Sequence, residues 1–141
     1  MKILIINGPN LNLLGRRQPE IYGLRAMDDI LDEVRAAFPG VEINYYQSNH
    51  EGALIDKIQE AGYDPAVRGI VLNAGGYTHT SVALADAVAA VPAPVVEVHL
   101  SNIAAREDFR RTSLLAPVCR GTISGLGAAV YELAVRALSA L

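Results

Sequence analysis

Residues 69–81, GIVLNAGGYTHTS, contain an apolar run, a glycine-rich turn and the beginning of a helical pattern. The run GIVLN is apolar without alternation, which is typical of a strand that is buried on both faces of a parallel sheet. A helical pattern follows at residues 81–90, where we expect Ala85 and Val88 to face inward. The stretch therefore predicts a strand, a tight turn and a crossover helix.

The same alternation extends along the chain in both directions. Further apolar runs predict strands at KILII (2–6), VEINYY (41–46), PVVEVHL (94–100) and CRGTIS (119–124). Helical patterns lie at residues 27–38, after the predicted capping box SNHE (48–51), and near 106–111, where the pattern is short and charged. A long final helix is predicted from apolar residues at helical spacing, namely Leu126, Val130, Leu133, Ala137 and Leu141.

This alternation predicts an α/β fold with helices on both faces of a parallel sheet. The second run alternates Val41, Ile43 and Tyr45 with more polar residues, which suits an edge strand. The pattern fits a flavodoxin-like three-layer sandwich with a five-stranded parallel sheet in the order 2-1-3-4-5. We expect residues 1–141 to form a single catalytic domain, with ligands beyond the carboxyl ends of the strands.

Composition excludes several classes of protein. The net charge is -3, from 12 basic and 15 acidic residues, so nucleic acid is not an expected partner. The single cysteine, Cys119, allows neither an intramolecular disulfide nor a zinc cluster, and we interpret it as a core residue. The opening MKILIING is too short for a signal peptide, and apolar stretches are too short to cross a membrane. We therefore expect a cytoplasmic protein.

The predicted strand ends carry imidazole, amide and hydroxyl groups. Glu97 and His99 are two residues apart in a strand, so both point to the same face. They form a candidate acid–base imidazole with an orienting carboxylate, although an isolated histidine at this place is more often structural. Gly75 and Gly76 have two interpretations, a tight turn into a helix or an anion site at a helix start.

Arginines surround the same predicted rim. Arg16, Arg17 and Tyr22 belong to a loop of about eighteen residues, which is either an active-site lid or a solvated loop. The segment REDFRR (106–111) is either a solvated helix face or part of a site for an anionic substrate, such as a carboxylate. The lysines, Lys2 and Lys57, lie away from this rim, which argues against Schiff-base chemistry.

Five segments together resemble the type II 3-dehydroquinate dehydratases over essentially the whole chain. They are GPNLNLLGRRQPEIYG (8–23), QSNHEG (47–52), NAGGYTHTSVALADA (73–87), VEVHLSN (96–102) and REDFRR. The resemblance implies a flavodoxin-like lyase without a cofactor or metal, assembled as a dodecamer of four trimers. It also implies anti dehydration of 3-dehydroquinate to 3-dehydroshikimate through an enolate, in the shikimate pathway of aromatic amino acid biosynthesis.

The resemblance also implies roles for individual residues. Tyr22 corresponds to the base, His99 to the proton donor, Arg17 to the group that stabilises charge near the tyrosine, and Glu97 to the partner of the histidine. Positions that match residues near the substrate are Asn10, Asn73, His79, Leu100, Ser101, Arg106 and Arg110, together with Asp86, which reaches the site of a neighbouring subunit. The competing hypothesis is a non-enzymatic flavodoxin-like module that binds an anion or a nucleotide.

Overall fold

A parallel sheet of five strands forms the centre of the fold, in the order β2-β1-β3-β4-β5. The computed structural model describes residues 1–22 and 24–141, and of Tyr22 it describes the backbone alone. The strands are β1 (Lys2–Asn7), β2 (Glu42–Gln47), β3 (Val67–Asn73), β4 (Val95–His99) and β5 (Gly121–Ser124). Both the predicted class of fold and the predicted strand order are confirmed.

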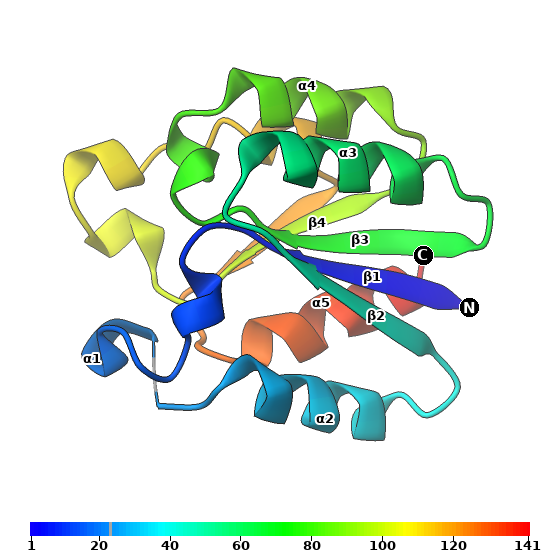
Figure 1. Ribbon diagram of the computed structural model, residues 1–141, viewed down its shortest axis with the longest axis horizontal. Coiled ribbons are helices and arrows are strands. Elements are labelled where there is room, and N and C mark those ends of the chain that lie inside the picture. The colour runs from blue at the N-terminus through cyan, green and yellow to red at the C-terminus, as the bar shows by residue number, and fades with distance from the viewer. Residues whose placement is uncertain (23) are drawn as a thin grey trace.

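Helices cover both faces of the sheet and complete the three layers (Figure 1). One face carries α3 (Glu51–Gly62) and α4 (Val82–Ala90), and the other carries α2 (Met27–Ala37) and α5 (Ala129–Ser139). Successive residues of β1 divide between the two cores: Ile3 and Ile5 pack with α2 and α5, whereas Leu4 and Ile6 pack with α3 and α4. A strand with apolar residues on both faces is therefore required here, as the sequence predicts.

The predicted edge strand is also confirmed. β2 pairs with β1 in parallel register, and it lies at one end of the sheet. Ile43 is buried, while Glu42 and Asn44 are exposed on the other face. Helix α4 likewise begins near its predicted position, with the Ser81 hydroxyl accepting a hydrogen bond from the Leu84 amide. Its buried residues are Leu84, Ala87 and Val88, whereas Ala85, predicted to face inward, is half-buried.

The predicted final helix is present, but it is shorter than the apolar spacing from Leu126 to Leu141, and it buries a different set of residues. Helix α5 begins at Ala129, because Gly125 and Gly127 adopt positive φ angles in the turn before it. The residues that it buries are Val130, Tyr131, Ala134, Val135 and Leu138, whereas Leu126, Leu133, Ala137 and Leu141 are exposed. Leu138 can approach β3 because Gly69 has no side chain. A Cβ at Gly69 would lie only 2.7 Å from the Leu138 side chain. Close helix–sheet packing thus selects a face that spacing alone does not predict.

The predicted capping box is wrong as well. The first residue before α3 is His50, which makes no side-chain cap. The Ser48 hydroxyl accepts from the His50 amide instead, and the Glu51 carboxylate accepts from the Ser81 hydroxyl across 2.5 Å. The glutamate is therefore used to join α3 to the beginning of α4 rather than to cap its own helix.

The connections at the carboxyl ends of the strands contain short turns of 3-10 helix. They are η1 (Leu11–Leu13), η2 (Gly75–His79), η3 (Ile103–Ala105), η4 (Asp108–Arg110) and η5 (Ala116–Val118), together with the four-residue α1 (Pro19–Tyr22). The charged helix predicted near 106–111 is therefore only η4 with its flanking turns. β5 begins at Gly121, and Cys119 precedes it, half-buried against the core beneath α3 and α4. In the described part of the chain, every helix is too short or too polar to span a membrane.

Candidate active site

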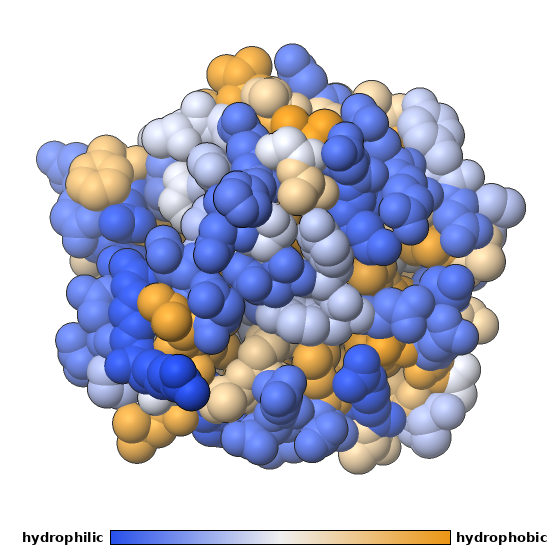
Figure 2. All heavy atoms as spheres, viewed as in Figure 1, coloured by the Kyte–Doolittle hydropathy of each residue, from blue (hydrophilic) through white to orange (hydrophobic). Residues whose placement is uncertain are grey.

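A cleft lies at the carboxyl ends of β1, β3 and β4, where the sheet order reverses direction. Its empty volume is about 730 Å³, open solvent at the mouth included. In Figure 2 the most hydrophilic atoms gather on the same side of the molecule as these strand ends. The lining comes from the loop after β1 (Pro9, Asn10, Leu11, Leu13, Leu14, Arg17), from the end of β3 and η2 (Asn73, Gly75, Gly76, His79), and from β4 and the segment after it (His99, Leu100, Ser101, Ile103, Arg106, Arg110).

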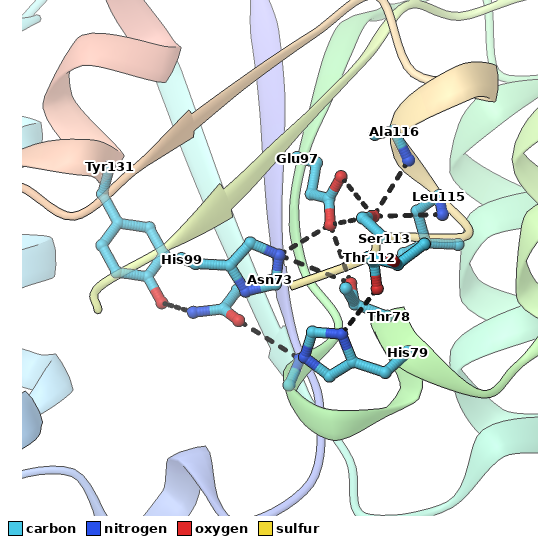
Figure 3. Close-up of polar contacts among 11 residues, drawn as sticks. Asn73, Thr78, His79, Glu97, His99, Thr112, Ser113, Leu115, Ala116 and Tyr131 are labelled. Atoms are coloured by element: carbon cyan, nitrogen blue, oxygen red, sulfur yellow. Dashed lines mark hydrogen bonds and ion pairs between the residues drawn. The ribbon is translucent and has the colours of Figure 1, made fainter. Parts of the chain in front are cut away.

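Two buried ionisable groups of this region, Glu97 and His99, lie at the end of β4. Glu97 is 0% exposed and His99 is 6% exposed, and His99 forms part of the cleft wall. The Nε2 atom of His99 lies 2.6 Å from Oε2 of Glu97 (Figure 3). Because Nε2–H donates to the carboxylate, Nδ1 is the ring nitrogen that can meet a ligand.

Two hydroxyl groups complete the surroundings of the Glu97 carboxylate. Thr78 donates to Oε2 across 2.8 Å, and the Ser113 hydroxyl lies 2.9 Å from Oε1 and 2.7 Å from Oε2. Burial by itself raises the pKa of Glu97, but the hydrogen bonds from His99, Ser113 and Thr78 outweigh it and bring the pKa below its usual range.

A second histidine lies beside the first. The rings of His79 and His99 are nearly parallel, with their centroids 6.4 Å apart. Nδ1 of His79 lies 2.8 Å from the Thr112 carbonyl oxygen, to which only an N–H can donate. The Nε2 atom of His79 is then the one that can bind a ligand in the cleft.

Asn73, at the end of β3, is held by a buried network. Its Nδ2 donates to the Tyr131 hydroxyl across 3.1 Å, and its Oδ1 accepts from the Gly75 amide across 3.2 Å. Tyr131 in turn donates to Oδ1 of Asn7 across 2.8 Å. These bonds fix the orientation of the Asn73 amide, so the wall of the cleft presents a defined donor and acceptor.

Asn10 is positioned by the backbone after β1. It adopts a left-handed conformation, with φ of 69°, and its amide donates to Oδ1 of Asn49 across 3.0 Å. Gln47 donates to the same Asn49 oxygen and to the Gly8 carbonyl. A Cβ on Gly8 would lie 2.6 Å from the Ala74 carbonyl oxygen, so only glycine allows the two loops to meet here.

Three cationic side chains also belong to the lining of the cleft. Arg17, Arg106 and Arg110 all line it. Nε of Arg110 lies 2.6 Å from Glu107, and Nη1 of Arg106 lies 3.5 Å from the Ser101 hydroxyl. Guanidinium groups beside a buried acid–base pair suit a substrate that is an anion and that develops further negative charge during the reaction.

The comparisons with known proteins agree with this geometry. A family model described as Dehydroquinase class II matches residues 1–139. This chain belongs to that family. It is 54% identical over 138 residues to a 3-dehydroquinate dehydratase of Pelodictyon phaeoclathratiforme, covering 98% of this chain and 91% of the relative. A similar protein from an Exiguobacterium strain, with the same description, is 53% identical and covers 98% and 94% of the two chains.

Solved structures give the same result. The type II dehydroquinase from Butyrivibrio crossotus superposes with a TM-score of 0.94 at 47% identity, covering 99% of this chain and 97% of that one. The type II dehydroquinase from Propionibacterium acnes has a TM-score of 0.93 at 39% identity, with the same coverage. The predicted family is thereby confirmed, and with it the flavodoxin-like architecture.

Most of the residues that the sequence singled out come together in this cleft. Those that line the cleft are Asn10, Arg17, Asn73, His79, His99, Leu100, Ser101, Arg106 and Arg110. Glu97 lies behind His99, and Asp86 is exposed on α4, outside the lining. The side chain of Tyr22 lies outside the described residues, so its predicted role stays a prediction; its backbone belongs to α1, on the same loop as Arg17.

Sequence reasoning missed several members of the site. Thr78 and Ser113 were not assigned, although Thr78 lies inside the motif NAGGYTHTS. The apolar part of the lining made by Leu11, Leu13 and Leu14 was also missed, because leucines in a long loop give no periodic signal. Ile103 gave no signal of its own either.

The glycine-rich turn after β3 behaves as a tight turn and not as a phosphate site. The Gly75 amide is already bonded to Asn73, residues 75–79 form 3-10 helix, and α4 begins only at Val82 with Ser81 as its cap. The hypothesis of a nucleotide-binding module loses its structural basis at this turn. Within the described residues, no group of three or more His, Cys, Asp or Glu side chains is placed to hold a metal ion.

Proposed function

We propose that this chain removes water from 3-dehydroquinate to give 3-dehydroshikimate, a step of the shikimate pathway, with residues 1–141 acting as a single catalytic domain. The observation that carries the proposal is the buried Glu97–His99 pair, which opens into a cleft that Arg17, Arg106 and Arg110 also line. Membership of the class II dehydroquinases supports the same substrate.

Tyr22 is the base in this proposal. A tyrosine ordinarily titrates near pH 10, so a phenolate at neutral pH needs a cation beside it. Arg17 belongs to the same loop and lines the cleft, which makes it the group to favour the phenolate. The phenolate takes the proton beside the ketone of the substrate, and the electron pair of that C–H bond forms an enolate.

The enolate needs hydrogen-bond donors, and Asn10 is the candidate to hold a water molecule against its oxygen. As the enolate returns its electron pair to carbon, the C–O bond on the opposite face breaks. The departing hydroxyl takes a proton from Nδ1 of His99 and leaves as water, which completes an anti elimination. Glu97 compensates the charge of the imidazolium before this step and orients the ring throughout.

The remaining lining residues bind the substrate. Asn73, His79 and Ser101 offer amide, imidazole and hydroxyl groups to its hydroxyls and carboxylate, while Leu100 supplies an apolar contact. Arg106 and Arg110 provide the positive charge that a carboxylate requires. All the protons of the reaction are moved by side chains and water, so the proposed mechanism needs no cofactor and no metal.

The direct test is an ultraviolet assay with 3-dehydroquinate, because the product contains a conjugated enone that absorbs where the substrate does not. We expect turnover without added metal or nucleotide, and a large loss in His99→Ala. In parallel, a thermal-shift comparison should show stabilisation by quinate-like carboxylates and not by nucleotides. A folded protein that is stabilised by nucleotides and leaves 3-dehydroquinate unchanged contradicts the proposal.

The proposed assembly is a dodecamer of four trimers in the cytoplasm. Asp86 is exposed on α4 and lies outside the cleft of its own chain, which fits a role in the site of a neighbouring subunit. Val82, one turn earlier on the same helix, is 63% exposed, and an apolar side chain of this kind suits a subunit contact.

Light scattering measures the size of the assembly directly, and a fully active monomer contradicts this part of the proposal. Co-expression of Asp86→Ala with Tyr22→Phe tests the shared site. If Asp86 acts across the subunit contact, mixed assemblies contain some intact sites and their kcat/KM exceeds the mean of the two parents. If each subunit is self-sufficient, the mixture gives that mean.

A further inference from the structure

The carboxylate of Glu97 is joined to three separate segments of the chain. His99 belongs to the same strand, β4, whereas Thr78 comes from η2 and Ser113 from the turn between η4 and η5. We propose that Thr78 and Ser113 are positioning residues for catalysis: they keep Glu97 ionised and fixed, and through Glu97 they hold the acid His99. The proposal deepens the proposed function, on which it rests for the role of His99.

The direction of the Ser113 hydroxyl is fixed by its other partners. Its oxygen accepts hydrogen bonds from the amides of Leu115, across 3.2 Å, and Ala116, across 3.0 Å. With these two donors on its lone pairs, the hydroxyl has its single proton left for bonding, and its oxygen lies within hydrogen-bond distance of both oxygens of Glu97 (Figure 3). Ser113 therefore acts as an obligatory donor to the carboxylate.

Thr78 is fixed in a similar way by the backbone around it. Its carbonyl accepts from the Leu114 amide across 2.8 Å, and the adjacent His79 ring bonds the Thr112 carbonyl. These bonds align η2, which also carries the cleft residue His79, with residues 112–114. A shift of either segment changes the position of Glu97 and of His99 together.

A buried carboxylate requires this kind of support. At zero exposure, Glu97 has lost its water, and an unpaired charge in that place is costly. His99 supplies one donor, but Oε1 receives its hydrogen bond from Ser113. With the hydroxyls present, the charge is distributed over three donors, and the imidazole meets a carboxylate of fixed orientation.

Among the described residues, few other ionisable groups act on Glu97. The Cys119 thiol is near enough for the charge of Glu97 to matter, and burial together with that charge raises the pKa of Cys119 to about 12, so the thiol stays neutral. His79 stacks beside His99, and Arg106 and Arg110 line the same cleft. The two hydroxyls are therefore the neutral groups whose removal changes the ionisation of Glu97 most directly.

The sign of the effect follows from the hydrogen bonds. Thr78 and Ser113 lower the pKa of Glu97, so their removal raises it towards the physiological range. Protonation of Glu97 ends the charge-assisted bond to His99. The bond is thus present at high pH and is lost as the pH falls through the pKa of Glu97, and this loss occurs at a higher pH in the variants.

The experiment uses Thr78→Val and Ser113→Ala, singly and combined, with Thr78→Ser and Ser113→Thr to restore a hydroxyl. Ser139→Ala is the matched control, because its hydroxyl bonds the Val135 carbonyl on α5, away from the cleft. One readout is the proton NMR resonance of His99 Nε2–H, followed as the pH is lowered. It needs no turnover, so it tests the hydrogen bonding independently of the proposed reaction. The other readout is kcat against pH.

In Thr78→Val and Ser113→Ala, we expect the Nε2–H resonance to disappear at a higher pH than in the native protein. We expect kcat to begin its fall on the acidic side of the pH profile at a higher pH as well. In the double variant both changes should occur at the highest pH. We also expect kcat at the optimum to fall about tenfold. Thr78→Ser, Ser113→Thr and Ser139→Ala should keep the native profiles. If Ser113→Ala does not fold, Thr78→Val and Thr78→Ser decide the question. A lower kcat with unmoved pH profiles and resonance overturns the proposal, as does full activity in a folded double variant.

Discussion

The two sides of the cleft are built differently. On one side, Asn73, Glu97 and His99 are buried at strand ends and are bonded by side chains from distant segments. The other side is the loop of residues 8–26, whose described backbone bonds near α1 are local: Arg16 and Arg17 donate to Leu13, and Ile21 donates to Gln18. The proposed acid, His99, is therefore positioned by the fold itself, while Tyr22, the proposed base, belongs to a short helical turn.

Gly15 brings the two ends of the segment that contains α1 close together. Gly15 has a φ of 91°, and a Cβ there would lie 3.0 Å from the Leu24 carbonyl and 3.2 Å from the Ala26 amide. The chain thus leaves and rejoins the body of the protein at one place. Changes on the loop should affect turnover while leaving stability intact, whereas changes in the wall should affect both.

The largest expected effect is at the base. Tyr22→Phe keeps the ring and removes the ionisable oxygen, so we expect kcat to fall by about a thousandfold while the melting temperature stays the same. Initial rates in the enone assay and a thermal melt measure the two quantities. Tyr63→Phe is the control, since Tyr63 is exposed and donates to the Ala90 carbonyl far along the chain. Near-normal turnover in Tyr22→Phe would remove it from the mechanism.

The next largest effect on turnover is expected for His99→Ala. Loss of the acid is expected to lower kcat by about a hundredfold or more. Because Glu97 then loses a hydrogen-bond partner while still buried, the variant should also melt at a lower temperature, unlike Tyr22→Phe. Binding of a carboxylate inhibitor should weaken far less than turnover. His50→Ala, at an exposed histidine, serves as control, and a loss of only a few-fold in His99→Ala indicates a structural histidine.

Arg17→Lys sharpens the comparison on the side of the loop. A lysine keeps the charge but not the planar guanidinium, so we expect kcat to fall about tenfold or more with unchanged stability. Arg16→Lys is the matched control, because Arg16 is exposed and lies outside the lining of the cleft. Equal kcat in the two variants would show that charge alone is needed.

Closure of the loop is tested separately by limited proteolysis. Equal proteolysis between Gly15 and Gly23 with and without a substrate analogue would argue against closure of the loop.

Tyr131→Phe should have the smallest effect on turnover and a clear effect on stability. The change removes the donor to Asn7 and the acceptor of Asn73 in a fully buried place. We expect a loss of about 1–3 kcal/mol in the free energy of unfolding, measured in urea, and a rise in KM of a few-fold as Asn73 loses its fixed orientation. An unchanged unfolding midpoint would mean that the network contributes nothing to stability.

Much of the fold follows from local patterns. Apolar runs such as GIVLN and KILII identify central strands, since a strand buried on both faces must be apolar throughout. The motifs around Asn10, Asn73 and His99 also place the cleft, because the carboxyl ends of parallel strands share one edge of the sheet. The buried face of α5 was not predictable in this way, since it depends on how closely Tyr131 and Leu138 pack on the sheet.

The sequence by itself determined the order of elements, the family, the cleft and the pairing of Glu97 with His99, because each depends on spacing within one segment or on recognisable motifs. Only the tertiary structure decided which groups support that pair. Thr78 and Ser113 are separated from Glu97 by 19 and 16 residues, and Tyr131 is separated from Asn7 by 124. A hydrogen bond needs its atoms placed within a few tenths of an ångström, and for segments so far apart that precision comes only from the packing of the whole core.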